Sequence, residues 1–542
     1  MTLKMLSHNL AIYCDEPVDT PQIELIESVA TAFPEWHFII IDGSTIHPES
    51  SSSPLANAST ESVHVGSSHS PEVIAEPSSS TLEMGARFPK PLPRSLSRLN
   101  QHNVEYHRVS ALDDPQVVRL IRELEPWAAI DLRQTQATPR EILNVPRCGT
   151  LLVETRFAPN ARHEADDHAF KAKSSNASIV VSRIRPDGDE LDVVLQGVLP
   201  DHAFSTPRGV ALRLELLAID TLIQSLRELD LSTDRATRID DRTPPCATLS
   251  MDPMRREDRA LTAGQGASSA GHRIERWLKA TYKRVILTQY VYGYARIRNF
   301  IRWIRRRSHA TVLVYHRVSD EFQDGITVGI EQFENQLKLL RRDHDIVDLP
   351  ELFASRSTAR KRPCVAITFD DGYADNRLAA LILRRFGIPC TFFVSTRIVG
   401  STNPFPHDMA RLGRHVATLS SSDISMMSGW GFHFGNHTAS HANLAQIPVA
   451  LAIQEIETGR SDLQRMHGES VASQWLAYPF GGRGDLTEAV HSELPGLGIT
   501  ACLSAFGGTN PPPCDPMRVC RQGVNYQYSL LHFRASIEGW IF

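Results

Sequence analysis

Short apolar runs alternate with amphipathic stretches towards both ends of the chain, and this alternation predicts two α/β regions. In the first region the expected strands are 9–13, 37–41 and 128–132, and the expected helices are 21–32, 115–125 and 211–228. Strands that alternate with helices in this way favour a largely parallel sheet with helices packed on its faces. The sequence therefore predicts an N-terminal α/β domain.

From residue 311 onward the alternation of strands and helices becomes denser. The expected strands are 311–315, 364–369, 390–394, 431–435 and 475–478, and the expected helices are 331–342, 377–386, 422–428 and 449–466. Repeated strand–helix units of this length again predict parallel strands, so this region is expected to form a second α/β domain.

Other segments lack a clear apolar period and mark the domain boundaries. Residues 49–80 are rich in Ser, Pro and Ala, which predicts a disordered or loosely attached insert. Residues 230–270 are rich in Pro, Gly, Ser and charged side chains, as linkers are. We therefore expect domains at 1–228 and 309–542, joined by a linker and a basic helix within 229–308.

The stretch 272–307 contains eleven Lys and Arg against one acid, Glu275, with tryptophans and tyrosines between them. A basic, aromatic and amphipathic helix of this kind suits the interface of an anionic membrane. Equally, the helix could pack its apolar stripe on a neighbouring domain and leave its arginines solvated. Nucleic-acid binding is not expected, because the chain as a whole has a formal net charge of −5.

The composition limits the class of protein. With 542 residues, 42% hydrophobic and 22% charged, the chain has the make-up of a globular protein of two or three domains. Its eight cysteines include no C-x-x-C pair, which favours a reducing compartment. We find no secretory signal and no apolar run of about 20 residues. The expected location is cytoplasmic, with membrane association left open.

The stretch 365–376, V-A-I-T-F-D-D-G-Y-A-D-N, places two carboxylates at the end of a buried strand. Adjacent like charges raise the pKa of one carboxyl unless a cation compensates them, so Asp370 and Asp371 indicate a metal and a base. A solvated Asp-Asp-Gly turn is the alternative.

Two histidines, His437 and His441, stand four residues apart in F-G-N-H-T-A-S-H. On a helical turn their rings would share one face, which suits a divalent metal, although two exposed helix histidines would look the same. Together with an Asp from another strand end, they predict a three-ligand catalytic site with a position open for water.

A third segment, L-A-Y-P-F-G-G at 476–482, is expected to be a strand that ends in a rigid turn. Pro479 and Gly481 would fix the backbone there and could aim an N–H group at a substrate oxygen.

In this order the three segments resemble the polysaccharide deacetylases of carbohydrate esterase family 4, the NodB-homology domain, over 311–542. The resemblance implies a distorted (β/α) barrel with its site at the carboxyl ends of the strands. It implies Asp370 as base, and Asp371, His437 and His441 as ligands of a divalent metal, with zinc expected. The remaining site residues are the Phe480 N–H for the oxyanion and Tyr373, Tyr478 and Pro479 for the substrate.

Two positions depart from that family. Ala477 stands at a position where the family often has an Arg that orients the base. A subgroup resembling exopolysaccharide deacetylases also has Ala at this position. The late Leu-x-His motif, whose His is the general acid, has no match near Arg521. Arg521 has too high a pKa to donate a proton, which leaves His316, His433 and His532 as candidates.

The N-terminal region resembles formyltransferases, which implies a Rossmann-type fold. The resemblance rests on P-R-C-G at 146–149, the strand that follows it, and D-E-L-D-V-V-L-Q at 189–196. Leu152 and Glu154 replace the family's Asn and His, which leaves Asp192 of its triad. Without a His to move protons, a non-catalytic formyltransferase-like domain is expected, with a generic doubly wound domain as the alternative.

The resulting hypothesis is a metal-dependent hydrolase that removes an N-acyl group, expected to be N-acetyl, from an amino sugar. A polysaccharide, an oligosaccharide and a lipid-linked glycan all remain open as substrates. The alternative is a non-catalytic carbohydrate-binding or assembly protein built from decayed enzyme domains.

Overall fold

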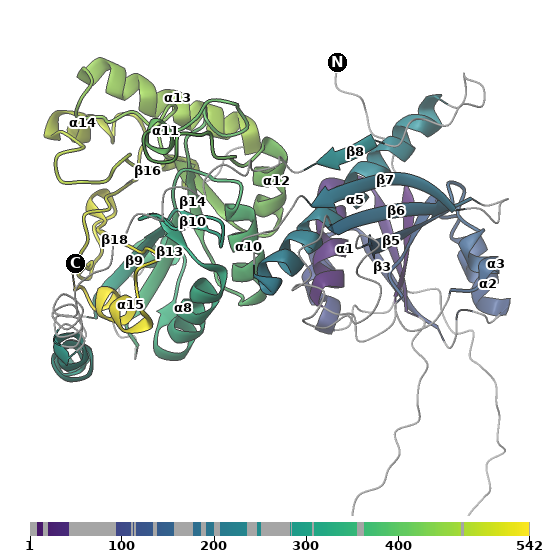
Figure 1. The fold of residues 1–542 in the computed structure, drawn as a ribbon, viewed down its shortest axis with the longest axis horizontal. Coiled ribbons are helices and arrows are strands. Elements are labelled where there is room, and N and C mark those ends of the chain that lie inside the picture. Colours follow the sequence, from purple (N-terminus) through teal and green to yellow (C-terminus); the bar gives the residue numbers. More distant parts are fainter. Residues whose placement is uncertain are drawn as a thin grey trace, which may run out of the picture. The chain divides into compact units, whose positions relative to one another are not determined.

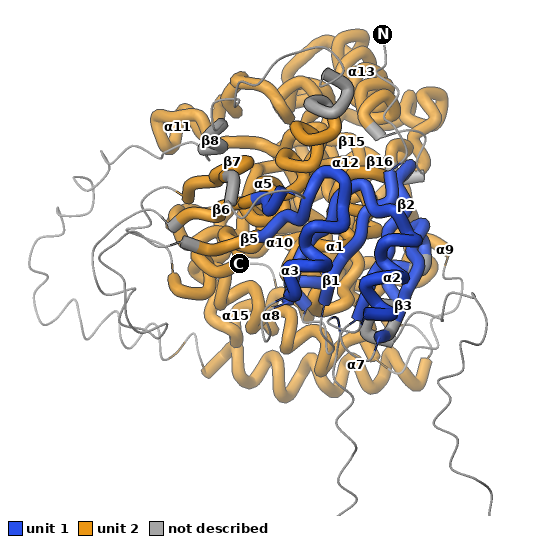
Figure 2. Tube along the Cα trace, turned by 90° about the vertical axis from the view of Figure 1, so that its right-hand side faces the viewer, with its two compact units in different colours: residues 1–23, 34–152, 183–192 blue, residues 24–33, 153–182, 193–542 orange. Residues whose placement is uncertain are grey.

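The computed structural model describes most of the chain (Figure 1). The described residues are 8–14, 20–42, 94–109, 112, 115–133, 138–156, 177–185, 191–199, 206–235, 247–250, 282, 285–305, 308–354, 362–467 and 471–540. The expected insert at 49–80 and most of the expected linker lie outside these residues, so the predicted domain boundaries stay predictions. Figure 2 colours two compact units, one of residues 1–23, 34–152 and 183–192, and one of 24–33, 153–182 and 193–542.

The first sheet has the strand order β3-β2-β1-β4-β5-β6-β7-β8. Its strands are β1 (Asn9–Cys14), β2 (His37–Asp42), β3 (Val104–Arg108), β4 (Ala128–Asp131), β5 (Thr150–Arg156), β6 (Ala177–Ile184), β7 (Leu191–Leu199) and β8 (Ala247–Ser250). Strands β1 to β5 pair in parallel, and the order reverses between β1 and β4, as in doubly wound folds. The expected Rossmann-type α/β fold is confirmed.

The helices that accompany this sheet are α1 (Thr20–Ala32), α2 (Pro115–Glu123), α3 (Arg140–Leu143) and α5 (Pro207–Arg235). Five of the six residues in each of β1 and β2 are fully buried, which explains why both strands are continuous apolar runs. Leu152 and Glu154 lie on β5 and Asp192 on β7, with β6 between the two strands. Asp192 therefore lies two strands away from Leu152 and Glu154 in the sheet order.

The second sheet runs β17-β16-β15-β14-β13-β9-β18, with β12 beside β13, and its described pairs are parallel. A bridge between Leu503 and Val519 brings its two edges together, so the barrel is nearly closed. The strands are β9 (Ala310–Tyr315), β12 (Asp345–Ile346), β13 (Cys364–Phe369), β14 (Thr391–Val394), β15 (His433–Asn436), β16 (Trp475–Ala477), β17 (Ala501–Leu503) and β18 (Arg521–Gly523). The distorted (β/α) barrel is confirmed.

The helices of this region are α8 (Ile330–Asp343), α9 (Leu349–Ala354), α10 (Asn376–Arg385), α11 (Pro406–Leu412), α12 (Ser421–Gly429), α13 (Val449–His467), α14 (Glu488–Glu493) and α15 (Leu530–Ile537). Between the sheet and its helices, Phe392 stacks between Phe369 and Phe434, with ring centroids 5.2 and 5.6 Å away, and Phe369 also lies 5.9 Å from Phe333 of α8. The three stacked rings come from three neighbouring strands, so their packing fixes the positions of the strand ends that carry the site.

The part of the basic segment that the structure describes is helical, with a π-turn η4 (Tyr290–Tyr294) followed by α7 (Ala295–Ile304). None of the helices in the described residues combines the length and the hydropathy needed to cross a membrane.

Candidate metal centre

The site begins where β13 ends and the backbone turns sharply. Asp371 has φ 74° and Gly372 has φ 81°, both in the left-handed region. A Cβ at position 372 would lie 2.8 Å from the side chain of Val394, so this turn requires glycine. The Asp370 N–H donates to the Tyr315 carbonyl at 2.9 Å, which ties the turn to β9. Both carboxylates are buried, which excludes the solvated turn.

Asp371 lies beside the two predicted histidine ligands. Its Oδ1 atom is 3.4 Å from His437 Nε2 and 3.2 Å from His441 Nε2, and all three residues are buried. Among the described residues, Oδ1 has no hydrogen-bond partner. Two imidazole nitrogens and an unsatisfied carboxylate oxygen therefore converge on one buried point, as the sequence predicted.

The prediction that these histidines lie on a helical turn is wrong. They lie in a loop that follows β15, and both Thr438 and His441 have left-handed backbones, with φ 64° and 60°. The Asn436 side chain accepts a hydrogen bond from the Thr438 N–H at 2.9 Å, which offers the backbone an alternative to a helix. Loop geometry, rather than helical periodicity, brings the two rings together.

The donor set fits a divalent cation such as zinc. The His437 Nδ1 atom lies 2.5 Å from the Ala477 carbonyl, which assigns the proton to Nδ1 and directs the Nε2 lone pair towards Asp371. Burial acts to raise the pKa of Asp371, but the two histidines outweigh it and hold the pKa well below its usual range. An ionised carboxylate and two imidazoles are common ligands of catalytic zinc.

Asp370 is held by a buried arginine from a different strand. Arg521, on β18, donates from Nη1 to Oδ1 at 2.7 Å and from Nη2 to Oδ2 at 2.6 Å. Its Nε donates to the Ser504 carbonyl at 2.7 Å, which fixes the guanidinium plane. Burial acts to raise the pKa of Asp370, yet Arg521 and nearby histidines lower it. Arg521 thus provides the contact that Ala477 cannot make.

Sequence reasoning did not find this role of Arg521. Arginine is almost never fully buried without a partner, so an Arg within a strand of a barrel core was the available signal. The strand β18 is only three residues long, however, and its pairing beside β9 could not be read from its composition.

Of the three candidate acids, His316 lies at the carboxyl end of its strand beside the carboxylates. It follows β9 directly and is half-buried, and its buried Nδ1 atom has no partner among the described residues. Burial lowers its pKa, while the charges of Asp371 and Asp370 oppose that shift. His433 begins β15 and so lies at the opposite strand end, and His532 on α15 contacts Ser529 at 2.6 Å.

The third segment forms the expected turn after β16. Phe480 is 56% exposed with φ 65°, and its ring lies 5.1 Å from the His441 ring. No hydrogen bond between described residues uses the Phe480 N–H. A Cβ at Gly481 would lie 2.4 Å from the Ala505 side chain, so this position also requires glycine.

Two residues that were predicted to contact the substrate have side-chain partners within the fold. Tyr373 is fully buried, and its hydroxyl donates to Asp408 at 2.9 Å and lies 2.8 Å from His407 Nε2. Tyr478 is buried against the core, and its hydroxyl donates to the Gly482 carbonyl at 3.3 Å. Pro479 is buried as well and lies in the turn after β16. Aromatic residues next to a motif were used here to build the core below the site.

His407 is a site residue that sequence reasoning missed. Its Nε2 is 3.8 Å from Asp371 Oδ2, and its ring lies 5.1 Å from the ring of His441. It comes from α11, which no strand-end motif marks. Only its contact with Tyr373 and its stacking on Phe405 bring it to the site.

Replacing Gly481 by Ala is expected to lower the free energy of unfolding by about 1–3 kcal/mol, because the new Cβ clashes with Ala505 in a left-handed backbone. Gly484 in the same loop is the matched control, since a Cβ there meets nothing within 4 Å. Thermal unfolding of both variants measures the difference. Equal unfolding of the two variants would contradict the requirement for glycine at 481.

Comparison with known proteins gives one family. Residues 357–498 match the model of the polysaccharide deacetylase family. The Bacillus subtilis (strain 168) protein YxkH, which is assigned to the polysaccharide deacetylases, is 26% identical over 187 residues. That match covers 33% of this chain and 60% of the relative, so this chain spans less than two thirds of that relative's length.

Solved structures match each half of the chain. IcaB from Ammonifex degensii is 23% identical, with 43% of this chain and 98% of that chain covered and a TM-score of 0.36. Phosphoribosylglycinamide formyltransferase from Anaplasma phagocytophilum is 11% identical, with 46% of this chain and 100% of that chain covered and a TM-score of 0.30. The matches to deacetylases cover the C-terminal region, and the matches to formyltransferases cover the N-terminal half.

Proposed function

From the polysaccharide deacetylase domain that the C-terminal region contains, we propose that this protein is a metal-dependent hydrolase that removes N-acetyl groups from the amino sugars of a glycan. One observation carries the proposal. The buried triad Asp371, His437 and His441 adjoins a second buried carboxylate, Asp370, that the Arg521 guanidinium keeps ionised. Amide hydrolysis of this kind requires a metal site that activates a water molecule and an ionised base that accepts its proton.

Asp371, His437 and His441 would hold the metal, and zinc is the proposed ion because of the two imidazole ligands. When bound, such an ion lowers the pKa of a water molecule and polarises a carbonyl group. The proton on His437 Nδ1 is directed at the Ala477 carbonyl, so this ring keeps a fixed orientation and its Nε2 stays available.

Asp370 acts as the general base in this proposal. Its carboxylate is ionised because Arg521 outweighs the effect of burial on its pKa. Each carboxylate oxygen has a second lone pair beyond the one that Arg521 occupies, so Asp370 can still accept the proton of the attacking water. The bidentate contact also prevents the side chain from rotating, which keeps the accepting oxygen in one position.

The tetrahedral oxyanion would receive a hydrogen bond from the Phe480 N–H. Three features support this role: the left-handed turn, the glycine that it requires, and the absence of a competing acceptor among the described hydrogen bonds. A backbone donor fixed before the reaction stabilises developing charge without reorganisation.

His316 is the proposed donor of a proton to the leaving amine. Its position at the end of β9, within the field of Asp370 and Asp371, supports the role. Burial lowers the pKa of His316 and so disfavours its protonated form, while the charges of Asp371 and Asp370 favour that form.

His316→Gln is expected to lower the rate of amide deacetylation by about 10²–10⁴-fold, the usual contribution of a general acid. It should leave the hydrolysis of 4-nitrophenyl acetate nearly unchanged, because that phenolate leaves without being protonated. Steady-state rates on an N-acetylglucosamine oligomer and on the ester separate the two effects. His433→Gln is the control, and equal losses on amide and ester would exclude the acid role.

The proposed function itself is tested by acetate release from a panel of N-acetylglucosamine oligomers, polymeric glycans and lipid-linked sugars. The alternative, a non-catalytic carbohydrate-binding or assembly protein, requires binding without release from any of them. The intact pairing of Asp370 with Arg521 favours catalysis, since a buried ion pair is costly to keep where no chemistry needs it.

A further inference from the structure

The helix α7 has its polarity reversed relative to a normal surface helix. Its inner face holds Arg298, which donates to the Glu538 carboxylate at 2.8 Å, and Asn299, which donates to the same oxygen at 2.7 Å. In a helix that only packs on its own domain, the apolar side chains face inward and the charged ones face solvent. Here polar side chains attach the helix to the end of α15.

The outer face of α7 and of the turn before it is apolar. Six of its side chains are between 43% and 63% exposed, namely Tyr294, Ile297, Phe300, Ile301, Trp303 and Ile304. Positions 294, 297, 301 and 304 follow one another at helical spacing, so they form one continuous stripe. The rings of Phe300 and Trp303 lie 5.7 Å apart at its edge. Leu287 and Val291, earlier in the same segment, do pack on Ala535 of α15, so the packing reading holds for them, whereas the stripe itself stays exposed.

The charged side chains around the stripe that lack an ion-pair partner among the described residues are positive. Arg296, Arg302 and Arg305 have no ion-pair partner among the described residues, and no acid lies between 285 and 305. Two copies of this face would bring like charges together, which opposes self-association. A nucleic acid would leave the exposed isoleucines without an apolar partner. An anionic surface with an apolar interior satisfies both the stripe and the arginines.

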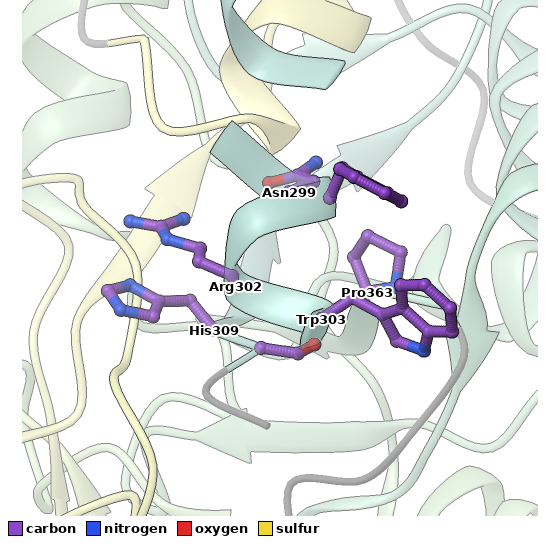
Figure 3. A pocket seen from close by; sticks show the side chains of 7 residues that line it. Asn299, Arg302, Trp303, His309 and Pro363 are labelled. Atoms are coloured by element: carbon purple, nitrogen blue, oxygen red, sulfur yellow. The ribbon is translucent and has the colours of Figure 1, made fainter. Parts of the chain in front are cut away.

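A hollow of about 320 Å³ lies beside the same helix. Figure 3 shows Arg302 and His309 on one side of α7 and Trp303 and Pro363 on the other. Burial lowers the pKa of His309 to about 4, and Arg302 and Arg298 add to the shift, so His309 is neutral at pH 7 and Arg302 is the cation of this hollow. Its lining thus pairs a cation with aromatic and apolar surface, a combination that complements the phosphates and acyl chains of an anionic bilayer.

We propose that the exposed stripe of α7 docks on a bilayer that contains anionic lipids, with Ile297, Phe300 and Ile304 in the interface and the free arginines against lipid phosphates. The hollow starts at the amino ends of β9 and β13, whereas the metal centre lies at their carboxyl ends. Docking through α7 would therefore not cover the metal centre, which lies at the other ends of these strands. The proposal is independent of the proposed chemistry.

Cosedimentation of the full chain with vesicles tests this. The protein is expected to bind phosphatidylglycerol-containing vesicles and not pure phosphatidylcholine vesicles, and 0.5 M salt should release it. Ile297→Ser with Ile304→Ser should weaken binding roughly 100-fold, about tenfold for each half-exposed side chain. Arg296→Gln with Arg305→Gln should weaken it roughly 25-fold, about fivefold for each arginine. Both pairs are exposed, so unfolding should not change.

The matched control is Val449→Ser with Leu451→Ser, two exposed apolar residues of α13, which should bind as the unaltered protein does. Equal binding to both vesicle types would overturn the proposal, as would an α7 variant that binds normally. The same holds if light scattering shows a dimer that the Ile297 and Ile304 changes dissociate, because the stripe would then be an interface between copies.

Discussion

Replacing Asp370 by Asn is expected to lower acetate release by about 10²–10⁴-fold while the metal stays bound. The amide cannot accept the proton of the attacking water, but it does not touch the ligand atoms of Asp371, His437 and His441. Metal content per chain and the rate on an N-acetylglucosamine oligomer, measured on the same preparation, separate the base from the ligands.

Asp371→Asn is the matched control for that experiment, because it makes the same chemical change at the neighbouring position. It should lose both the metal and the activity, since it removes the one carboxylate of the three-ligand group. If Asp370→Asn lost its metal and Asp371→Asn kept it, the two roles would have to be exchanged. Full activity of Asp370→Asn would remove the base from the mechanism altogether.

Arg521→Met is expected to lower the free energy of unfolding by about 3–5 kcal/mol at pH 7 and to abolish most activity. The change leaves the Asp370 carboxylate buried without its counter-charge, and burial then raises the pKa of Asp370 instead of Arg521 lowering it. Denaturant unfolding and the deacetylation rate measure the two losses.

The pH dependence of that loss has a definite sign. In the unaltered protein the pKa of Asp370 lies below its usual 3.8, so the stability it contributes is present above that pH and is lost as the pH falls through the folded value. In Arg521→Met the pKa of Asp370 is expected to lie above its usual value, so the free energy of unfolding of that variant falls as the pH rises. The difference in unfolding free energy between the two proteins should therefore shrink on acidification.

The double variant Arg521→Met with Asp370→Leu checks the cause. Since it removes both charges, it should be more stable than Arg521→Met alone, which is the expected behaviour of a buried ion pair. A double variant less stable than either single variant would indicate that Arg521 acts by packing, for example through its contact with Phe393, rather than by charge.

The sequence predicted those parts of the fold that depend on local periodicity. A buried strand such as β13 requires a run of apolar residues, and a half-buried helix such as α13 requires apolar residues at helical spacing. The first and last residues of both elements could therefore be predicted from the sequence within a few positions. The proposed ligands Asp371, His437 and His441, which the structure brings together, could also be named from the sequence, because their residue types are rare together at strand ends.

What sequence reasoning missed depends on contacts between distant segments. Arg521 and Asp370 are 151 positions apart in the sequence, and the residues around β18 contain no local pattern that predicts their contact. His407 reaches Asp371 only because Tyr373 and Phe405 hold it. The loop that carries His437 and His441 was taken for a helix, because spacing alone does not distinguish a helical turn from two left-handed residues.

The central claim is that a metal held by Asp371, His437 and His441 is required for deacetylation, and a zinc titration tests it most directly. The protein is stripped with a chelator, zinc is added back in steps, and bound zinc and acetate release from an N-acetylglucosamine oligomer are measured at each step. We expect no release from the stripped protein and a rate that rises in proportion to bound zinc up to one ion per chain, with neither in Asp371→Asn. A stripped protein that keeps its full rate, or a fully loaded one that releases no acetate from any N-acetylated glycan, would contradict this account.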